Sequence, residues 1–125
     1  MPEPSPPTAS TPRLVILLNN ASIDAPERVV TALRYATTAA AMDVAVEMHA
    51  VGRSAAVFRS GAADGALMAQ IRQAVALGVE LFVCPAALVE QGLHADELIE
   101  EVAGVRGAAS LLAAGLEPGA RFMVF

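Results

Sequence analysis

Tryptophan and lysine are absent from this 125-residue sequence, and cysteine and tyrosine occur once each. Aromatic residues make up only 4% of the chain, which leaves few platforms for stacking nucleobases or sugars. The net charge is −5 and all eight basic residues are scattered arginines, so no nucleic-acid partner is expected. Although 55% of the residues are hydrophobic, no uninterrupted apolar run approaches the ~20 residues of a membrane span. We therefore expect a soluble protein with an aliphatic core and no membrane partner.

Cys84, the single cysteine, cannot form an internal disulfide, and no Cys/His pair has the spacing of a zinc site. A free thiol in an acidic chain is typical of the reducing cytoplasm, where we expect the protein to act. A nucleotide or flavin enzyme is the rival hypothesis. Because no Gly-x-Gly-x-x-Gly or P-loop follows the first expected strand, we predict no cofactor and no metal.

The chain divides into a tail and one domain. Residues 1–12 contain five prolines mixed with Ser and Thr, which predicts a disordered tail. Residues 13–125 alternate strand and helix patterns. We expect strands at 14–18, 44–51, 79–83, 102–105 and 121–125, and helices at 26–42, 66–77, 85–91 and 107–114. Asp24 and Glu27 have the spacing of a capping box for the first helix. Strand–helix alternation with short connections predicts an α/β fold, a three-layer α/β/α sandwich around a mostly parallel sheet of four or five strands.

Cys84 directly follows the third expected strand and precedes Pro85, which suits the first position of a helix. Cys84 is then the helix N-cap, close to the unpaired backbone N–H groups of Ala86 and Ala87. These donors favour an anionic sulfur. The alternative is a buried cysteine that acts as a small hydrophobe. The chain has no second cysteine that could resolve an intermediate formed on Cys84. If Cys84 is reactive, the acceptor must therefore be another molecule.

The segment 79–93, an apolar strand ending in Val-Cys, then a small-residue helix and Gly-Leu, resembles the active-cysteine segment of the DsrE family. Segments 14–20, 32–36, 104–112 and 121–125 resemble other parts of that family, in the same order. The resemblance implies a flavodoxin-like sheet and assembly into homotrimers or hexamers. It also implies that Cys84 receives persulfide sulfur and passes it to a TusA-like or rhodanese-like partner.

Four polar residues follow the first and second strands, at the sheet edge expected to hold Cys84. Arg53 and Arg59 could attract an anionic sulfur donor, although solvated arginines are the ordinary interpretation. Asn19 and Asn20 could contact the sulfur or a bound anion, although asparagine is also a common loop former.

Glu47 and His49 alternate on the second strand, which indicates one shared face, polar or at a subunit interface. His94 is expected in a loop. Neither histidine has a spacing that argues for metal binding or general-base work. Four carboxylates are expected on one solvated helix face: Asp96, Glu97, Glu100 and Glu101.

These observations predict a sulfur carrier or sulfurtransferase that accepts sulfane sulfur on Cys84 as a persulfide and passes it to a partner thiol. The alternative is a non-catalytic homo-oligomeric scaffold or regulatory binding protein in which Cys84 is structural. The sequence names neither the donor and acceptor nor the pathway.

Overall fold

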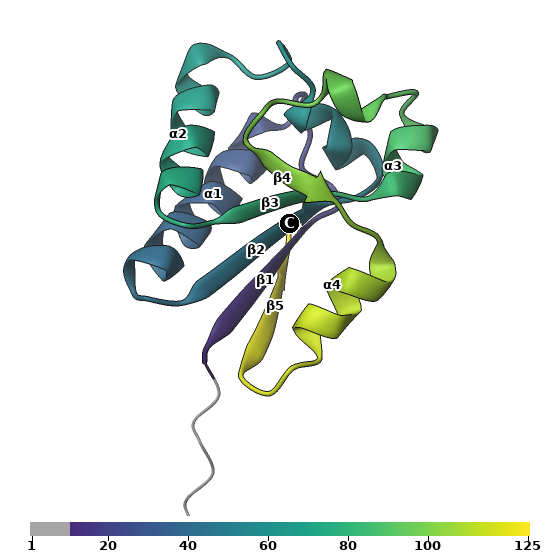
Figure 1. The fold of residues 1–125 in the computed structure, drawn as a ribbon. Helices are drawn as coiled ribbons and strands as arrows, with labels where there is room; N and C mark the ends of the chain where they lie inside the picture. Colours follow the sequence, from purple (N-terminus) through teal and green to yellow (C-terminus); the bar gives the residue numbers. More distant parts are fainter. Residues whose placement is uncertain (1–10) are drawn as a thin grey trace, which may run out of the picture.

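Strands and helices alternate along the whole described part of the chain, residues 11–125 of a computed structural model (Figure 1). The strands are β1 (Arg13–Leu18), β2 (Ala45–Ala50), β3 (Glu80–Val83), β4 (Val102–Val105) and β5 (Ala120–Val124). The α-helices are α1 (Pro26–Ala41), α2 (Gly65–Ala76), α3 (Pro85–Glu90) and α4 (Ala108–Gly115), with 3-10 turns η1 (Gly52–Phe58) and η2 (Ala95–Glu97).

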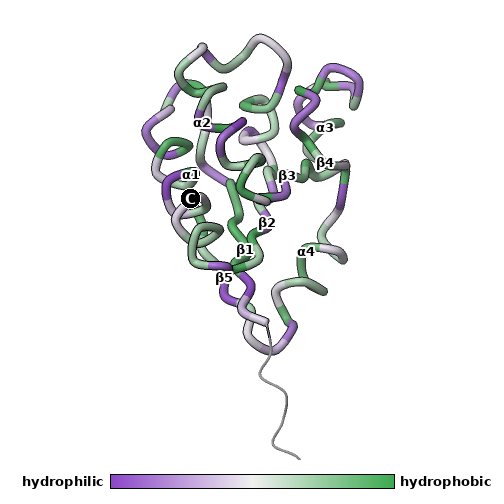
Figure 2. Tube along the Cα trace, turned by 60° about the vertical axis from the view of Figure 1, so that its left-hand side comes forward, coloured by the Kyte–Doolittle hydropathy of each residue, from purple (hydrophilic) through white to green (hydrophobic). Residues whose placement is uncertain are grey.

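The five strands form one parallel sheet in the order β4-β3-β2-β1-β5. Strands β2, β3 and β4 follow one another on one side of β1. The chain then crosses back, and β5 pairs with the other side of β1. Because parallel crossovers are right-handed, this return puts α4 on the opposite face from α1 and α2, as Figure 2 shows. The expected α/β/α sandwich with a parallel sheet is confirmed.

One face of the sheet is apolar and packs against α1 and α2. Alternate residues of β2, namely Val46, Met48 and Ala50, belong to this core and are at most 2% exposed. Ile16 of β1 and Leu81 of β3 lie beside Met48 in the parallel register. Strands covered on both sides read as nearly continuous apolar runs, which is why β1 and β3 were predictable.

The other face is covered by α4 and is partly polar. Glu47 and His49 point to this side because side chains alternate along β2, and both are buried, at 6% and 2% exposure. Glu47 and His49 share one face, as predicted. This face is buried within the chain, under α4, and is not a subunit interface. Figure 2 shows mostly green strands between the helix layers, with purple on loops and helices.

Several local expectations were wrong. Helix α1 begins after Ala25, which makes no side-chain capping hydrogen bond; the Ala25 N–H instead closes a turn onto the Ser22 carbonyl, at 3.0 Å. The predicted capping box of Asp24 and Glu27 is therefore absent. Residues 52–58, which lie between the second expected strand and the second expected helix, form the 3-10 turn η1.

The acidic residues 96–101 lie on η2 and the following turn and not on one helix. The predicted tail lies mostly outside the described residues. Within them, the Pro12 carbonyl accepts a hydrogen bond from the Ala45 N–H at 3.2 Å, which joins this residue to the start of β2.

Gly115 allows α4 to lie close to β5. A Cβ built on Gly115 would overlap the tip of the Phe122 ring. We predict that Gly115→Ala lowers the free energy of unfolding by about 1 kcal/mol, the low end of the overpacking range, because the half-exposed ring can turn partly aside. Urea denaturation measures the change.

The matched control is Gly65→Ala at the start of α2, where an added Cβ meets nothing within 4 Å. This variant should be neutral or slightly stabilising because alanine restricts the unfolded chain. Equal effects of the two substitutions would contradict the close α4–β5 packing.

Candidate functional site

Cys84 lies where β3 ends and α3 begins. Its backbone N–H donates to the Ala50 carbonyl at 3.0 Å, and its own carbonyl accepts from the Leu88 N–H at 3.2 Å. Hydrogen bonds to β2 and α3 therefore hold its backbone in place. Cys84 is the N-cap of α3, as predicted, but its side chain makes no capping hydrogen bond. The sulfur is thus not bound to the N–H groups of Ala86 or Ala87, and it is partly exposed.

A small hollow of about 50 Å³ lies beside Cys84. Residues from β2, from the ends of β3 and β4, and from α4 line it: His49, Val51, Cys84, Arg106, Gly107, Ala108 and Leu111. A cavity needs roughly 10–15 Å³ to hold one water molecule. The hollow therefore has room for one added sulfur atom, and a bulky ligand does not fit inside it.

A chain of ionic contacts reaches this hollow under α4. Arg13 Nη1 donates to Glu47 Oε1 at 2.8 Å, and His49 Nε2 lies 3.1 Å from Glu47 Oε2. Arg13 also lies 3.5 Å from the exposed Glu117. The buried carboxylate of Glu47 thus has a cation on one oxygen and an imidazole on the other, as a buried charge requires.

Phe82 contacts two of the residues that line the hollow, His49 and Arg106. The His49 and Phe82 rings pack with their centroids 5.1 Å apart. The Arg106 guanidinium lies over the same Phe82 ring, 4.2 Å from its centroid, in cation–π geometry. The stack places a positive charge beside the hollow although Arg106 itself is exposed.

The other sequence-predicted binding residues do not line this hollow. Asn19 and Asn20 are exposed, and their backbone N–H groups donate to the Phe125 carbonyl. Arg53 lines a shallow surface pocket with Asn20 near the start of α1. Arg59 lies 3.6 Å from Glu97.

The two alanines after Pro85 also lie outside the lining. Ala86 is exposed, and Ala87 is buried in the core. Binding roles for these six residues remain sequence-based predictions.

Sequence reasoning missed His49, Arg106 and Leu111 as neighbours of Cys84. A signal existed for Arg106, since Arg106 and Gly107 follow β4, whose carboxyl end meets the same sheet edge. The position of His49 depends on which face α4 covers, which local patterns do not reveal.

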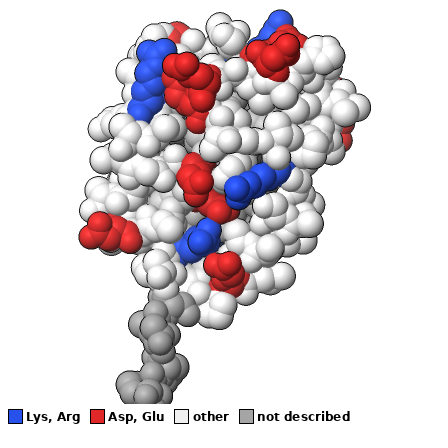
Figure 3. Space-filling model, in the orientation of Figure 1, with Lys and Arg blue, Asp and Glu red and all other residues white. Residues whose placement is uncertain are grey.

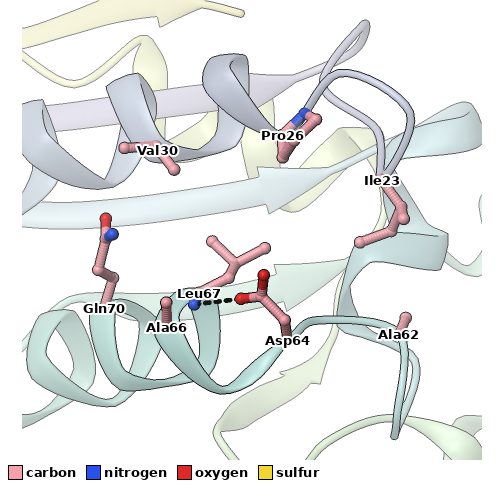
Figure 4. Close-up of a pocket in the computed structure, with 8 residues that line it drawn as sticks. All are labelled: Ile23, Pro26, Val30, Ala62, Asp64, Ala66, Leu67 and Gln70. Atoms are coloured by element: carbon pink, nitrogen blue, oxygen red, sulfur yellow. Dashed lines mark hydrogen bonds between the residues drawn. The ribbon is translucent and has the colours of Figure 1, made fainter.

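A second hollow, of about 320 Å³, lies between the starts of α1 and α2 (Figure 4). Its lining is mostly apolar, with Ile23, Val30 and Leu67 among the residues drawn. Its one carboxylate, Asp64, already accepts a hydrogen bond from the Leu67 N–H at 2.8 Å and so caps α2. This hollow offers no free reactive group, so the Cys84 hollow is the better candidate site.

Charges are mixed over the surface. On the face seen in Figure 3, acidic and basic side chains lie near one another and form no large region of one sign. No helix within residues 11–125 is long and apolar enough to cross a membrane. In the same residues, no group of three or more His, Cys, Asp or Glu side chains is arranged to hold a metal ion.

Comparison with protein families gave a match to the DsrE/DsrF-like family over residues 13–125. The chain belongs to the DsrE/DsrF-like family. The resemblance seen in the sequence is thereby confirmed. Membership of this family suggests a role in sulfur relay. The search of curated proteins gave no match.

Solved structures share the fold of this DsrE/DsrF-like chain. A protein of unknown function, MTH1491 from Methanobacterium thermoautotrophicum, superposes with a TM-score of 0.73 at 19% identity, covering 91% of this chain and 99% of its own. The ychN protein from E. coli gives a TM-score of 0.74 at 14% identity, with 93% and 100% covered. At such identities the likeness establishes the fold alone.

Leu111 of this DsrE/DsrF-like chain limits access to Cys84 because it lines the hollow from α4. We predict that Cys84 reacts with iodoacetamide much faster than with a bulky aryl maleimide. Leu111→Ala should raise the maleimide rate about tenfold by widening the hollow. Intact mass against time measures both rates.

The neighbouring Leu112→Ala is the matched control, since Leu112 is half exposed and does not line the hollow. It should leave both rates unchanged. A maleimide rate that is equal in wild type and Leu111→Ala would show that α4 does not screen the thiol.

Proposed function

We propose that this protein is a sulfur carrier that holds sulfane sulfur as a persulfide on Cys84 and passes it to a thiol of a partner protein. The observation that carries the proposal is the position of Cys84: a partly exposed thiol beside a hollow large enough for one sulfur atom. Family membership points to the same chemistry.

The transfer is an exchange without net oxidation. The Cys84 thiolate attacks the outer sulfur of a donor persulfide, R–S–SH, and a new sulfur–sulfur bond forms while the donor bond breaks. The donor leaves as R–SH after taking the proton that Cys84 lost. Transfer to an acceptor thiol is the same step in reverse, with Cys84 as the leaving group.

A single cysteine supports a carrier more than a self-contained oxidoreductase. No second thiol is present in the chain to attack the Cys84 persulfide and release its sulfur. The acceptor must therefore come from another molecule. A TusA-like or rhodanese-like protein, and a cytoplasmic location, remain the expectations from the sequence.

The surroundings of the hollow favour a negatively charged sulfur species. Arg106 supplies a guanidinium, and Gly107 and Ala108 bring the N-terminus of α4 to the same place. Backbone N–H groups at a helix N-terminus have no partner within the helix and attract anions. Both features would stabilise the terminal sulfur of a persulfide anion.

Sulfur loading tests the proposal. After incubation with a small-molecule persulfide or a loaded sulfurtransferase, the wild-type protein should gain about 32 Da, the mass of one sulfur atom. The gain should disappear on treatment with dithiothreitol and should be absent in Cys84→Ser. No gain in wild type, or an equal gain in Cys84→Ser, would refute persulfide carriage.

Assembly with further copies of this chain is supported by an exposed apolar surface on α4 and β5. Leu112 and Leu116 on the α4 side are 50% and 77% exposed, and Phe122 and Val124 on β5 are 42% and 61% exposed. Strand β5 is also an edge of the sheet. Such a surface on an unpaired edge is a common site of self-association. The same surface favours the alternative function, a homo-oligomeric scaffold in which Cys84 only fills space.

Leu116→Arg tests this assembly. We predict that the wild type sediments as a homotrimer or hexamer and that Leu116→Arg raises its dissociation constant about tenfold or more, because a buried charge replaces an apolar contact. Analytical ultracentrifugation measures the change.

Met42→Arg is the matched control, because Met42 also follows the last turn of a helix and is 71% exposed. Arginine at a helix C-terminus is compatible with the helix dipole, so both variants should fold. A monomeric wild type would contradict the assembly.

A further inference from the structure

The Glu47–His49 pair lies under α4 and beside the reactive site, although persulfide carriage as proposed above assigns neither residue a role. Both side chains are almost completely buried, at 6% and 2% exposure. Burying a carboxylate and an imidazole is costly compared with the apolar residues that fill the opposite face. His49 also lines the same hollow as Cys84.

The hydrogen bond to Glu47 determines where the His49 ring carries its proton. In the tautomer with the proton on Nε2, the ring donates across the 3.1 Å contact to Glu47 Oε2, because a carboxylate oxygen accepts. In the neutral ring this leaves Nδ1 with a free lone pair. In the described part of the chain, the contact with Glu47 is the one side-chain hydrogen bond that the ring makes.

Strand register places this ring on the same face of the sheet as Cys84. His49 pairs with Phe82, and the next pair on the two strands is Ala50 with Val83, which Cys84 follows. Side chains two residues apart on one strand share a face, so His49 and Cys84 are diagonal neighbours. Their shared contact with the hollow agrees with this placement.

We propose that His49 is the general base and acid of the Cys84 sulfur exchange and that Glu47 is its positioning residue. This inference rests on the proposed function and deepens it. During loading, His49 accepts the thiol proton of Cys84 as the sulfur attacks the donor persulfide. It then returns that proton to the departing donor sulfur, so the ring ends the step as it began. During unloading, the ring accepts the proton of the attacking acceptor thiol and passes it to the departing Cys84 sulfur.

The charged groups near His49 come from β1, from β3 and from the segment that follows β4. Arg13 of β1 binds Glu47, Glu80 of β3 pairs with Glu47 in register, and Arg106 lies beyond β4 over Phe82. Helix α4, which covers this face, contributes no titratable side chain. Glu47 is the one carboxylate in hydrogen-bond contact with the ring among the described residues.

His49→Gln tests the proposal, because the glutamine amide can still donate to Glu47 while the ring that accepts a proton is lost. We expect sulfur loading from a small-molecule persulfide at pH 7 to slow about 100-fold, the lower end of general acid–base contributions. The difference in loading rate between wild type and His49→Gln should shrink to less than about threefold near pH 9.5, because hydroxide then replaces His49 as the base. Loading is followed by intact mass across this pH range.

His94→Gln, a change at the other histidine of the chain, is the matched control and should keep the wild-type profile. Glu47→Gln retains the ring and removes its carboxylate partner, so it should give an intermediate loss at pH 7 with the same pH dependence. If His49→Gln fails to fold, the dependence of the loading rate on pH in Glu47→Gln tests the role of His49 instead. Loading that is unchanged at pH 7, or slowed equally at every pH, would overturn the role of His49.

Alkylation of Cys84 by iodoacetamide separates this inference from the proposed function. A wild-type protein that takes up no sulfur refutes persulfide carriage, but its thiol can still be alkylated. The alkylation rate at pH 7 should then fall at least about tenfold in His49→Gln and not in His94→Gln. Superimposable alkylation profiles would show that His49 does not exchange a proton with Cys84.

Discussion

The alternation of side chains along β2 is the constraint on which both the core and the candidate site depend. Val46, Met48 and Ala50 point into the apolar layer under α1 and α2, while Glu47 and His49 point under α4. A shift of one residue in the register would bury the charged pair in the apolar layer and move the apolar residues of β2 to the α4 side. The parallel pairing with β1 and β3 fixes that register and brings Arg13 to Glu47.

The candidate site is assembled from elements that are distant in the sequence. Strand β2 contributes His49, the β3–α3 junction contributes Cys84, and the β4–α4 connection contributes Arg106. Phe82 joins them, since its ring contacts both His49 and the Arg106 guanidinium. The arrangement combines a thiol, an imidazole ring and a positive charge around a hollow of about 50 Å³. We infer that sulfane sulfur is the cargo because this space suits a single sulfur atom and the family is linked to sulfur relay.

Much of the fold could be predicted because its signals are local. Apolar runs marked β1 and β3, helical periodicity marked α1 and α2, and Pro85 marked Cys84 as an N-cap. The neighbours of Cys84 could not be predicted, because they depend on the return of the chain from β4 across the sheet to β5. That return places α4 over His49, whereas Asn19 and Asn20 at the end of β1 meet Phe125 instead of Cys84. Asp24 and Glu27 have the spacing of a capping box, yet a backbone turn from Ser22 to Ala25 starts α1.

Persulfide carriage on Cys84, as proposed, requires the hollow beside it to receive one sulfur atom. The most direct measurement is a crystal structure of the protein after treatment with a persulfide donor. We expect one additional atom bonded to the Cys84 sulfur, directed into the hollow between His49 and Arg106. An unmodified Cys84 in treated crystals, or an added sulfur directed to solvent away from His49 and Arg106, would contradict it.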